Sequence, residues 1–356
     1  MMKKLALLLP VCLLLAVAAF AAGGGVSDPL VSLSYLLGPF TKEVEEQVES
    51  RLDQAESGNA ADSGTRTSAV WAETRLKQGD ALTGTTGTGA LLLAGSGTVL
   101  YDWGTVIDVT AGTEVPSGSA MAVDHRYMVA EDTSARFQIT SKTAVLDYQG
   151  SYGFETSNAV DYNAMASALK ELNLFRGSFT GYGQGFDLEL VPTRLQALIM
   201  FIRVLGEEEA ALAWTGSTPF TDIAKGSQAE RYVGYAYEKG YTNGYSATQF
   251  KPGNAVNVGQ YTEFLLRAMG YSSAANTDLS DTLERAEQAG VLTAGEVSAL
   301  RTDRFLRADL VYVSYYALEA ELPDGRQTLA DTLMDKNVFT LRDWRNASAL
   351  VKSGRR

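Results

Sequence analysis

A helix-forming segment occurs in three copies in the second half of this sequence, and it limits the folds that the chain can adopt. The copies are PTRLQALIMFIRVLG (192–206), VNVGQYTEFLLRAMG (256–270) and the more divergent LRADLVYVSYYAL (306–318). Gln196 aligns with Gln260 in the second copy, and Arg194 aligns with Arg307 in the third. A recurring supersecondary unit buries its apolar face against its neighbours, so the copies are expected to form one helical body.

The segments that lead into these helices also correspond. Gly177 pairs with Gly244, and Phe186 pairs with Phe250. Both glycines are most simply turn residues in the left-handed region, which glycine enters without steric cost. The unit is therefore helix, glycine-rich loop and capped helix. It predicts repeats at residues 160–206, 207–270 and 271–340, followed by a C-terminal tail at 341–356.

The N-terminus has the pattern of a secretory signal peptide over residues 1–21. Lys3 and Lys4 precede an apolar run over residues 5–17, and AFA at 19–21 is a small-x-small cleavage site. The only cysteine, Cys12, lies within this segment, so the mature chain is expected to have neither a disulfide nor thiol chemistry. The predicted location is outside the cell.

The charge balance limits the partners. The formal net charge is −12, and it becomes about −14 when the two N-terminal lysines are removed, because residues 1–21 contain no acidic side chain. An acidic secreted chain is not suited to coat nucleic acid or an anionic membrane. No later stretch reaches the ~18 apolar residues of a membrane span. We therefore expect no nucleic-acid partner and no membrane association after cleavage.

The first half predicts a different structure from the second. Residues 22–75 are expected to be a lead segment with one amphipathic helix, carried by Val44, Val48 and Leu52, and a polar linker. Residues 76–150 contain short β-branched runs separated by Gly, Thr and Ser, which predicts a small all-β domain. The predicted fold class is α+β, with this β domain followed by an all-α region.

Several spaced residues in the second half resemble one family. They are the Phe220-Thr221-Asp222 opening, the Gly240-x-x-x-Gly244 loop, Phe250-Lys251-Pro252 and the helix head Thr193-Arg194-Leu195-Gln196. Together they resemble the S-layer homology domain, over residues 160–340. The resemblance implies a pseudo-threefold helical module that binds secondary cell-wall polysaccharide, often with a pyruvate ketal on the sugar. It also implies a cell-wall or cell-surface location, with the β domain displayed outside the wall, and no cofactor.

The resemblance also implies the residues of the glycan site. The signature arginines Arg194 and Arg307 would meet the carboxylate of the ketal, whereas the second copy has Val258 at this position. Tyr232 occupies the place of an aromatic residue that stacks on sugar in the family. The other implied ligand-binding residues are Thr193, Gln196, Asp309, Asp222, Gly177 and Gly244.

The chemistry of the helix head supports two interpretations. A guanidinium grips a carboxylate through two parallel hydrogen bonds, and unpaired N–H groups of the first helical turn would assist it. Thr193-x-x-Gln196 is also a capping box, which any helix can use. The second copy keeps a cap, Asn257-x-x-Gln260, without the arginine, and the third keeps Arg307 without a polar cap. The polar helix cap and the arginine therefore vary independently among the three copies. Asp222 remains open between a ligand contact and a turn cap.

An enzyme is not expected. The single histidine, His125, has no Gly-x-Ser-x-Gly serine to activate, and no cluster of His, Cys and carboxylates suggests a metal site. Two alternatives to wall anchoring stay open. The helical region could act through protein–protein contacts and self-associate in a surface layer. The β domain could bind an external glycan or protein as an adhesin, using Trp71, Tyr101 and Trp103.

Overall fold

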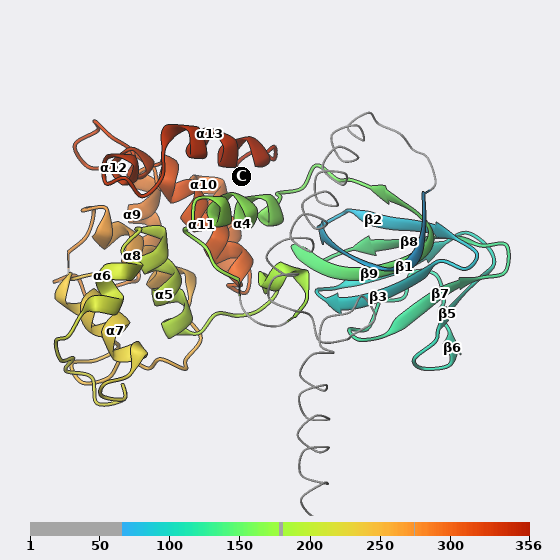
Figure 1. The fold of residues 1–356 in the computed structure, drawn as a ribbon, viewed down its shortest axis with the longest axis horizontal. Coiled ribbons are helices and arrows are strands. Elements are labelled where there is room, and N and C mark those ends of the chain that lie inside the picture. Colours follow the sequence, from blue (N-terminus) through green and yellow to red (C-terminus); the bar gives the residue numbers. More distant parts are fainter. Residues whose placement is uncertain (1–65, 178–180, 274) are drawn as a thin grey trace, which may run out of the picture. The chain divides into compact units, whose positions relative to one another are not determined.

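The structure is a computed structural model that describes residues 66–177, 181–273 and 275–356. The predicted signal peptide and amphipathic helix lie outside these residues. Residues from Thr65 onward form one compact unit. This unit has two hydrophobic cores, one within a β-sheet and one among helices (Figure 1). The predicted α+β class is consistent with this arrangement.

The sheet is antiparallel and has nine strands within the described residues. The strands are β1 (Arg66–Lys77), β2 (Ala81–Thr85), β3 (Gly89–Ala94), β4 (Gly97–Tyr101), β5 (Thr105–Asp108), β6 (Thr113–Glu114), β7 (Arg126–Ala130), β8 (Ser134–Ile139) and β9 (Thr143–Glu155). The long strand β9 pairs with β1, β2 and β3. The sheet thus begins before the expected residue 76 and ends after residue 150, because β1 pairs along most of β9.

The sheet core follows from alternation along its strands. In β8, Ala135, Phe137 and Ile139 are buried, and the residues between them are more exposed. Because successive side chains of a strand point to opposite faces, this pattern places one face on the core. Leu82, Leu92 and Leu146 fill the same core from β2, β3 and β9.

The helical region begins after β9. Its helices are α4 (Tyr162–Glu171), the one-turn 3₁₀ helix η1 (Gly183–Gly185), α5 (Arg194–Val204), α6 (Glu208–Ala213), α7 (Gln228–Glu238), α8 (Val258–Ala268), α9 (Thr282–Gln288), α10 (Ala294–Thr302), α11 (Arg307–Glu319), α12 (Leu329–Asp335) and α13 (Leu341–Leu350). The repeated segments are therefore α5, α8 and α11. The predicted tail contains α13, which packs against α4.

The three repeated helices contact one another. An earlier helix of each predicted repeat packs on the repeated helix of another: α4 on α11, α7 on α5 and α9 on α8. α11 is buried almost throughout its length, from Ala308 to Leu318. The apolar periodicity of the repeats thus corresponds to one shared core, which spans all three segments.

Candidate functional site at the head of α5

The first turn of α5 is capped as the sequence predicts. Thr193 Oγ1 accepts from Gln196 N (3.2 Å), and Gln196 Oε1 accepts from Thr193 N (3.0 Å). The same reciprocal cap joins Asn257 and Gln260 at α8. These bonds satisfy backbone donors that have no partner within the helix.

The remaining donors of this turn are bound by the following repeat. Arg194 N donates to Asn254 O (2.7 Å), and Leu195 N donates to Pro252 O (3.1 Å). The expectation that free N–H groups at the α5 head assist an anion is therefore wrong. The loop of the next repeat occupies them, so the side chain of Arg194 is what this helix head offers to a ligand.

The Arg194 side chain is buried but has no ionic partner among the described residues. The residue is 5% exposed, and its guanidinium lies over the rings of Phe250 (4.9 Å) and Phe264 (5.5 Å). Nη2 donates to Gly244 O (3.2 Å) and approaches Thr242 Oγ1 at 3.5 Å. Nε is buried without a hydrogen-bond partner. A buried cation without a paired carboxylate is costly, which makes it a candidate for binding an external anion.

Burial, and to a smaller extent the nearby charge of Arg267, lower the pKa of Arg194 to about 10. The guanidinium still remains protonated at neutral pH. The site therefore presents a positive charge that is poorly solvated, and an anionic ligand would stabilise it.

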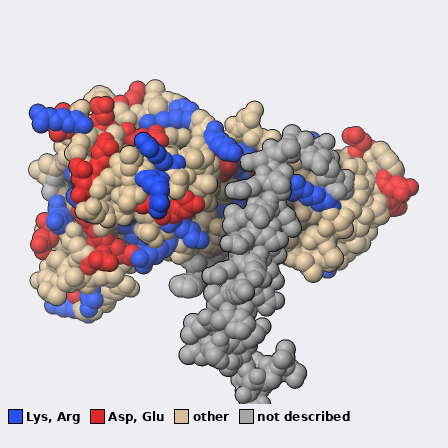
Figure 2. Space-filling model, turned by 45° about the horizontal axis from the view of Figure 1, so that its top comes forward, with Lys and Arg blue, Asp and Glu red and all other residues tan. Residues whose placement is uncertain are grey.

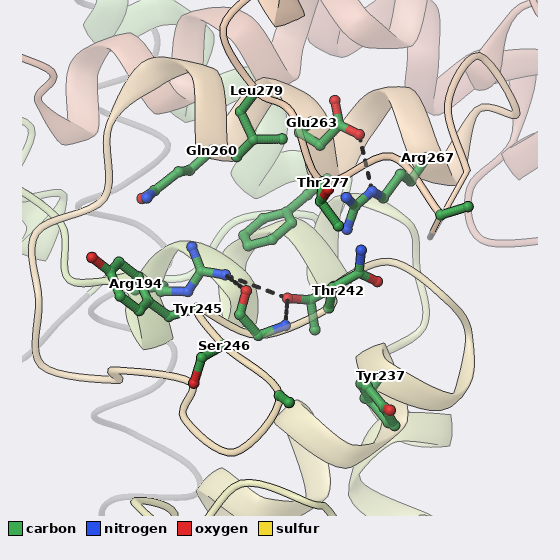
Figure 3. A pocket seen from close by; sticks show the side chains of 15 residues that line it. Arg194, Tyr237, Thr242, Tyr245, Ser246, Gln260, Glu263, Arg267, Thr277 and Leu279 are labelled. Carbon is green, nitrogen blue, oxygen red and sulfur yellow. Dashed lines mark hydrogen bonds and ion pairs between the residues drawn. The ribbon is translucent and has the colours of Figure 1, made fainter.

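Arg194 lines a cavity of about 580 Å³ that involves all three predicted repeats. Figure 3 shows how its side chains converge from the loop after α7, from α8 and from the segment before α9. The lining residues are Arg194, Tyr237, Thr242, Asn243, Gly244, Tyr245, Ser246, Ala247, Gln260, Glu263, Phe264, Arg267, Ala275, Thr277 and Leu279. Among the described residues of the lining, hydroxyl, amide and aromatic groups surround the Arg194 charge, which suits a ligand of sugar size.

Arg267 differs from Arg194 because internal acceptors hold it. Its Nε pairs with Glu263 Oε1 (3.0 Å), and Nη2 donates to Asn276 O (2.6 Å). Arg285 pairs with the other oxygen of Glu263 (2.9 Å). This network fixes the segment before α9 against α8 and so shapes one wall of the cavity (Figure 3).

The loop that faces Arg194 is fixed by Gly244 and Asp222. Gly244 has φ +79°, as predicted, and a Cβ there would lie 2.2 Å from the Phe220 ring. Asp222 accepts from the backbone of Phe250 (2.9 Å) and Lys251 (2.7 Å). Asp222 is absent from the cavity lining, so its described contacts are those of a loop cap.

The head of α11 has a different arrangement. Arg307 is half-buried, its Nε donates to Phe186 O (3.2 Å), and its guanidinium lies 5.7 Å from the Phe175 ring. Burial lowers its pKa. Asp309 is 1% exposed, and both its oxygens accept from Lys142 Nζ, at 2.7 and 2.9 Å. The predicted ligand residue Asp309 is thus held in an internal ion pair.

Two further predicted site residues have other contacts. Tyr232 is 2% exposed, and its hydroxyl donates to Glu208 Oε1 (2.7 Å), away from the cavity lining. Gly177 does not have the left-handed backbone expected of it; a Cβ there would meet Gly185 O at 2.9 Å. Close backbone approach explains this glycine instead. At α8, Val258 packs half-buried against the helical core.

Sequence reasoning missed the aromatic residues that do line the cavity. Tyr237 and Tyr245 are 44% and 57% exposed, and Lys251 Nζ lies 3.5 Å from the centroid of the Tyr245 ring. Tyrosines just before and after the glycine loop were a usable signal, since an exposed aromatic beside a polar cavity can stack on a sugar ring.

The other candidates give no catalytic arrangement. His125 Nδ1 lies 2.6 Å from Asp108 Oδ2, at the surface of the sheet. The described residues include no group of three or more His, Cys, Asp or Glu side chains placed to hold a metal ion. None of the helices in the described ranges combines the length and the apolar character needed to cross a membrane.

The aromatic residues considered for an adhesin role differ in exposure. Trp103 is 64% exposed, whereas Trp71 is 36% exposed and lies under the Arg126 guanidinium at 4.8 Å. The Tyr101 hydroxyl donates to Val115 O (2.7 Å). The contacts of Tyr101 are those of a residue that fixes a strand.

Comparison with protein-family models points to the same part of the chain. Residues 219–261 match the S-layer homology domain. The match covers α7, the cavity loop and the head of α8. A surface layer protein of Brevibacillus choshinensis is 28% identical over 109 residues, which are 30% of this chain and 10% of that protein. A cell surface protein of Thermoanaerobacter kivui is 28% identical over 163 residues, 42% of this chain and 20% of that protein. The chain thus spans a tenth and a fifth of these relatives.

Proposed function

We propose that this chain is a non-enzymatic cell-surface protein that holds a cell-wall polysaccharide non-covalently through its helical region. The S-layer homology match and the relatives named for the cell surface support an anchoring role. The observation that carries the proposal is the buried Arg194 guanidinium, which lines a cavity with both polar and apolar surface and has no carboxylate partner among the described residues.

We propose further that α5, α8 and α11 form the centre of a pseudo-threefold module. Their mutual contacts support it, and so does the cyclic packing of α4 on α11, α7 on α5 and α9 on α8. In such a module each groove lies between neighbouring repeats. The cavity beside Arg194 fits that position, because its lining comes from the α5 head, the second repeat and the start of the third.

The ligand we propose is a wall glycan that bears a carboxylate, such as a pyruvate ketal. Its carboxylate would accept from the Arg194 guanidinium, which lines the cavity. Tyr237 and Tyr245 would contact the ring faces, and Gln260 and Ser246 would bind hydroxyl groups. One charge-assisted hydrogen bond contributes about 1.5–3 kcal/mol, so a single site binds weakly and depends on this arginine.

A cell-wall sedimentation assay tests the proposal. Purified wall polysaccharide is used intact and after mild acid removal of its ketals. We expect the full mature chain to bind intact polysaccharide, and Arg194→Ala to weaken binding by about ten- to a hundredfold. Arg342→Ala, an exposed arginine on α13, removes the same formal charge and serves as the control.

Two results would count against the proposal. One is equal binding by Arg194→Ala and Arg342→Ala, because it would leave the cavity without a role. The other is undiminished binding after ketal removal, which would exclude the carboxylate as the recognised group.

N-terminal sequencing of exported protein tests the proposed signal cleavage after residue 21.

A second candidate function is assembly through protein–protein contacts. It is favoured by Val258 at the α8 head and by the internal ion pair of Asp309 at the α11 head, since both leave fewer heads for glycan. Analytical ultracentrifugation distinguishes the two functions: an assembly subunit self-associates at micromolar concentration without wall material, and a glycan anchor stays monomeric.

A further inference from the structure

The α11 head contacts the sheet through a half-buried lysine. Lys142, in the turn between β8 and β9, is 12% exposed at its side chain and places Nζ 2.7 Å from Asp309 Oδ1. It also pairs with Asp303 at 3.0 Å. Burial raises the pKa of Asp309, and Lys142 and the N–H of Leu306 oppose that rise. The buried carboxylate therefore depends on a cation that the sheet supplies.

Strand β1 makes a second contact, with the loop of the first repeat. Arg75 is 6% exposed at its side chain. Its guanidinium donates to Asn163 Oδ1 (2.8 Å), Gly183 O (3.0 Å) and Glu189 Oε1 (2.5 Å). Glu73 accepts from Gly183 N (2.8 Å). All three nitrogens of this guanidinium have acceptors, which is the pattern of a built interface.

These two contacts meet at the α11 head. The loop that Arg75 binds also holds the first turn of α11, because Arg307 N donates to Leu190 O (2.8 Å) and Ala308 N to Leu188 O (3.0 Å). The sheet thus binds both sides of one helix head: the loop through Arg75 and the helix through Lys142.

The position that Lys142 fills has a counterpart at α8. Asp309 is the third residue of α11, as Gln260 is of α8. Gln260 lines the open cavity, whereas Asp309 is covered by the Lys142 ammonium. Because Gln260 lines the cavity of the preceding head, α5, the corresponding groove for Asp309 is the one beside Val258 at the α8 head, and the Lys142 ammonium fills it. At Arg307 itself, Phe186 O already accepts from Nε.

We propose that the sheet is an internal ligand of the helical region, docked at the α11 head by Lys142 and Arg75, so that glycan binds through the α5 cavity alone. The inference of a single glycan site rests on the proposed function, whereas the docking of the sheet does not. The contacts of Lys142 and Arg75 then fix the sheet to the helical region. The helical region supplies one glycan site for each chain.

Hydrogen–deuterium exchange of the full mature chain tests the docking without any glycan. We expect Lys142→Met to accelerate exchange in peptides 183–190 and 303–312 by on the order of tenfold or more, with little change in peptide 242–254. Lys225→Met, an exposed lysine before α7, is the matched control and should change neither region. Unchanged exchange at 183–190 and 303–312 would overturn the docking.

A double variant distinguishes loss of docking from general unfolding. Lys142→Met leaves a buried charge, whereas Lys142→Met/Asp309→Asn removes both charges and keeps an oxygen to accept from Leu306 N. We expect the double variant to regain thermal stability and still show faster exchange at 183–190. Recovery of both properties would mean that the ion pair does not hold the sheet.

Calorimetry with a methyl glycoside that carries a pyruvate ketal tests the single site. We expect one site in the wild-type chain, lost in Arg194→Ala and unchanged in Arg307→Ala. Two sites, or weaker binding in Arg307→Ala, would contradict closure of the α11 head. No binding by any variant would refute the proposed function, and the exchange result would still decide the docking.

Discussion

The heads of α5 and α11 share a design and differ in what surrounds their arginine. In each, a loop from another repeat accepts from the first backbone N–H groups, and the guanidinium lies over an aromatic ring. Around Arg194 the remaining space is an open cavity with both polar and apolar surface. Near Arg307 the head is bound by the sheet through Asp309. The two arginines therefore share a sequence position but have different surroundings.

Thr242 and Phe175, which occupy equivalent places in the two loops, account for part of the difference between the surroundings of Arg194 and Arg307. Thr242 precedes Gly244 by two residues and offers a hydroxyl to Arg194. The equivalent place before Gly177 is Phe175, whose ring offers only its face to Arg307. A hydroxyl can hold a guanidinium in place for an anion, whereas a ring adds apolar bulk at the same point.

The largest effect is expected from the glycines of the two loops. Gly244→Ala should lower the free energy of unfolding by about 2–5 kcal/mol, since the left-handed backbone and the Phe220 ring both oppose a Cβ. Gly177→Ala should cost about 1–3 kcal/mol, because the close carbonyls of Gln184 and Gly185 oppose a Cβ but the backbone is not left-handed. Urea unfolding of both variants measures this. Equal losses would mean that the two loops are not constrained differently.

Thr242→Val tests whether the hydroxyl beside Arg194 holds the guanidinium in place. The hydroxyl accepts from Gly244 N (3.1 Å) as well as approaching Arg194, so its loss leaves a buried donor unpaired at about 1–3 kcal/mol. We expect about five- to tenfold weaker binding of wall polysaccharide, with Thr242→Ser close to wild type. Undiminished binding by the valine variant would show that Arg194 needs no hydroxyl to stay in place.

The smallest effect concerns pH. A carboxylate needs a protonated Arg194, whose pKa is about 10, so binding should be constant from pH 6 to 8 and fall as the pH rises through about 10. In Arg194→Lys, burial lowers the pKa of an amine that starts from about 10.4, and the decline should begin at lower pH. Binding measured against pH for both proteins tests this. If the two proteins gave the same dependence of binding on pH, the group that titrates would not be residue 194.

The sequence was sufficient for features that depend on neighbouring residues. The caps at Thr193 and Asn257 were predicted and are confirmed, because both partners lie within one helical turn. The helical repeats were visible because their apolar spacing is local. The resemblance drawn from Phe220, Gly244 and Phe250 agrees with the family match at 219–261.

Features that join distant residues could not be predicted. Lys142 and Asp309 are 167 positions apart, and nothing near either residue indicates the other. The acceptors of Asn254 and Pro252 at the α5 head depend on how two repeats meet. Strand β1 was assigned to a linker because its stability comes from pairing with β9.

The cyclic packing has a consequence for how the helical region loses its structure. In an open solenoid, end units can peel away while the others remain folded. Here the first repeat closes on the last: α4 packs on α11, and the carbonyls of Leu188 and Leu190 cap that helix. Because the first and last described segments of the helical region pack together, tension applied to the sheet should not release the repeats one by one. In the proposed anchor, the helical region should therefore unfold in a single cooperative event.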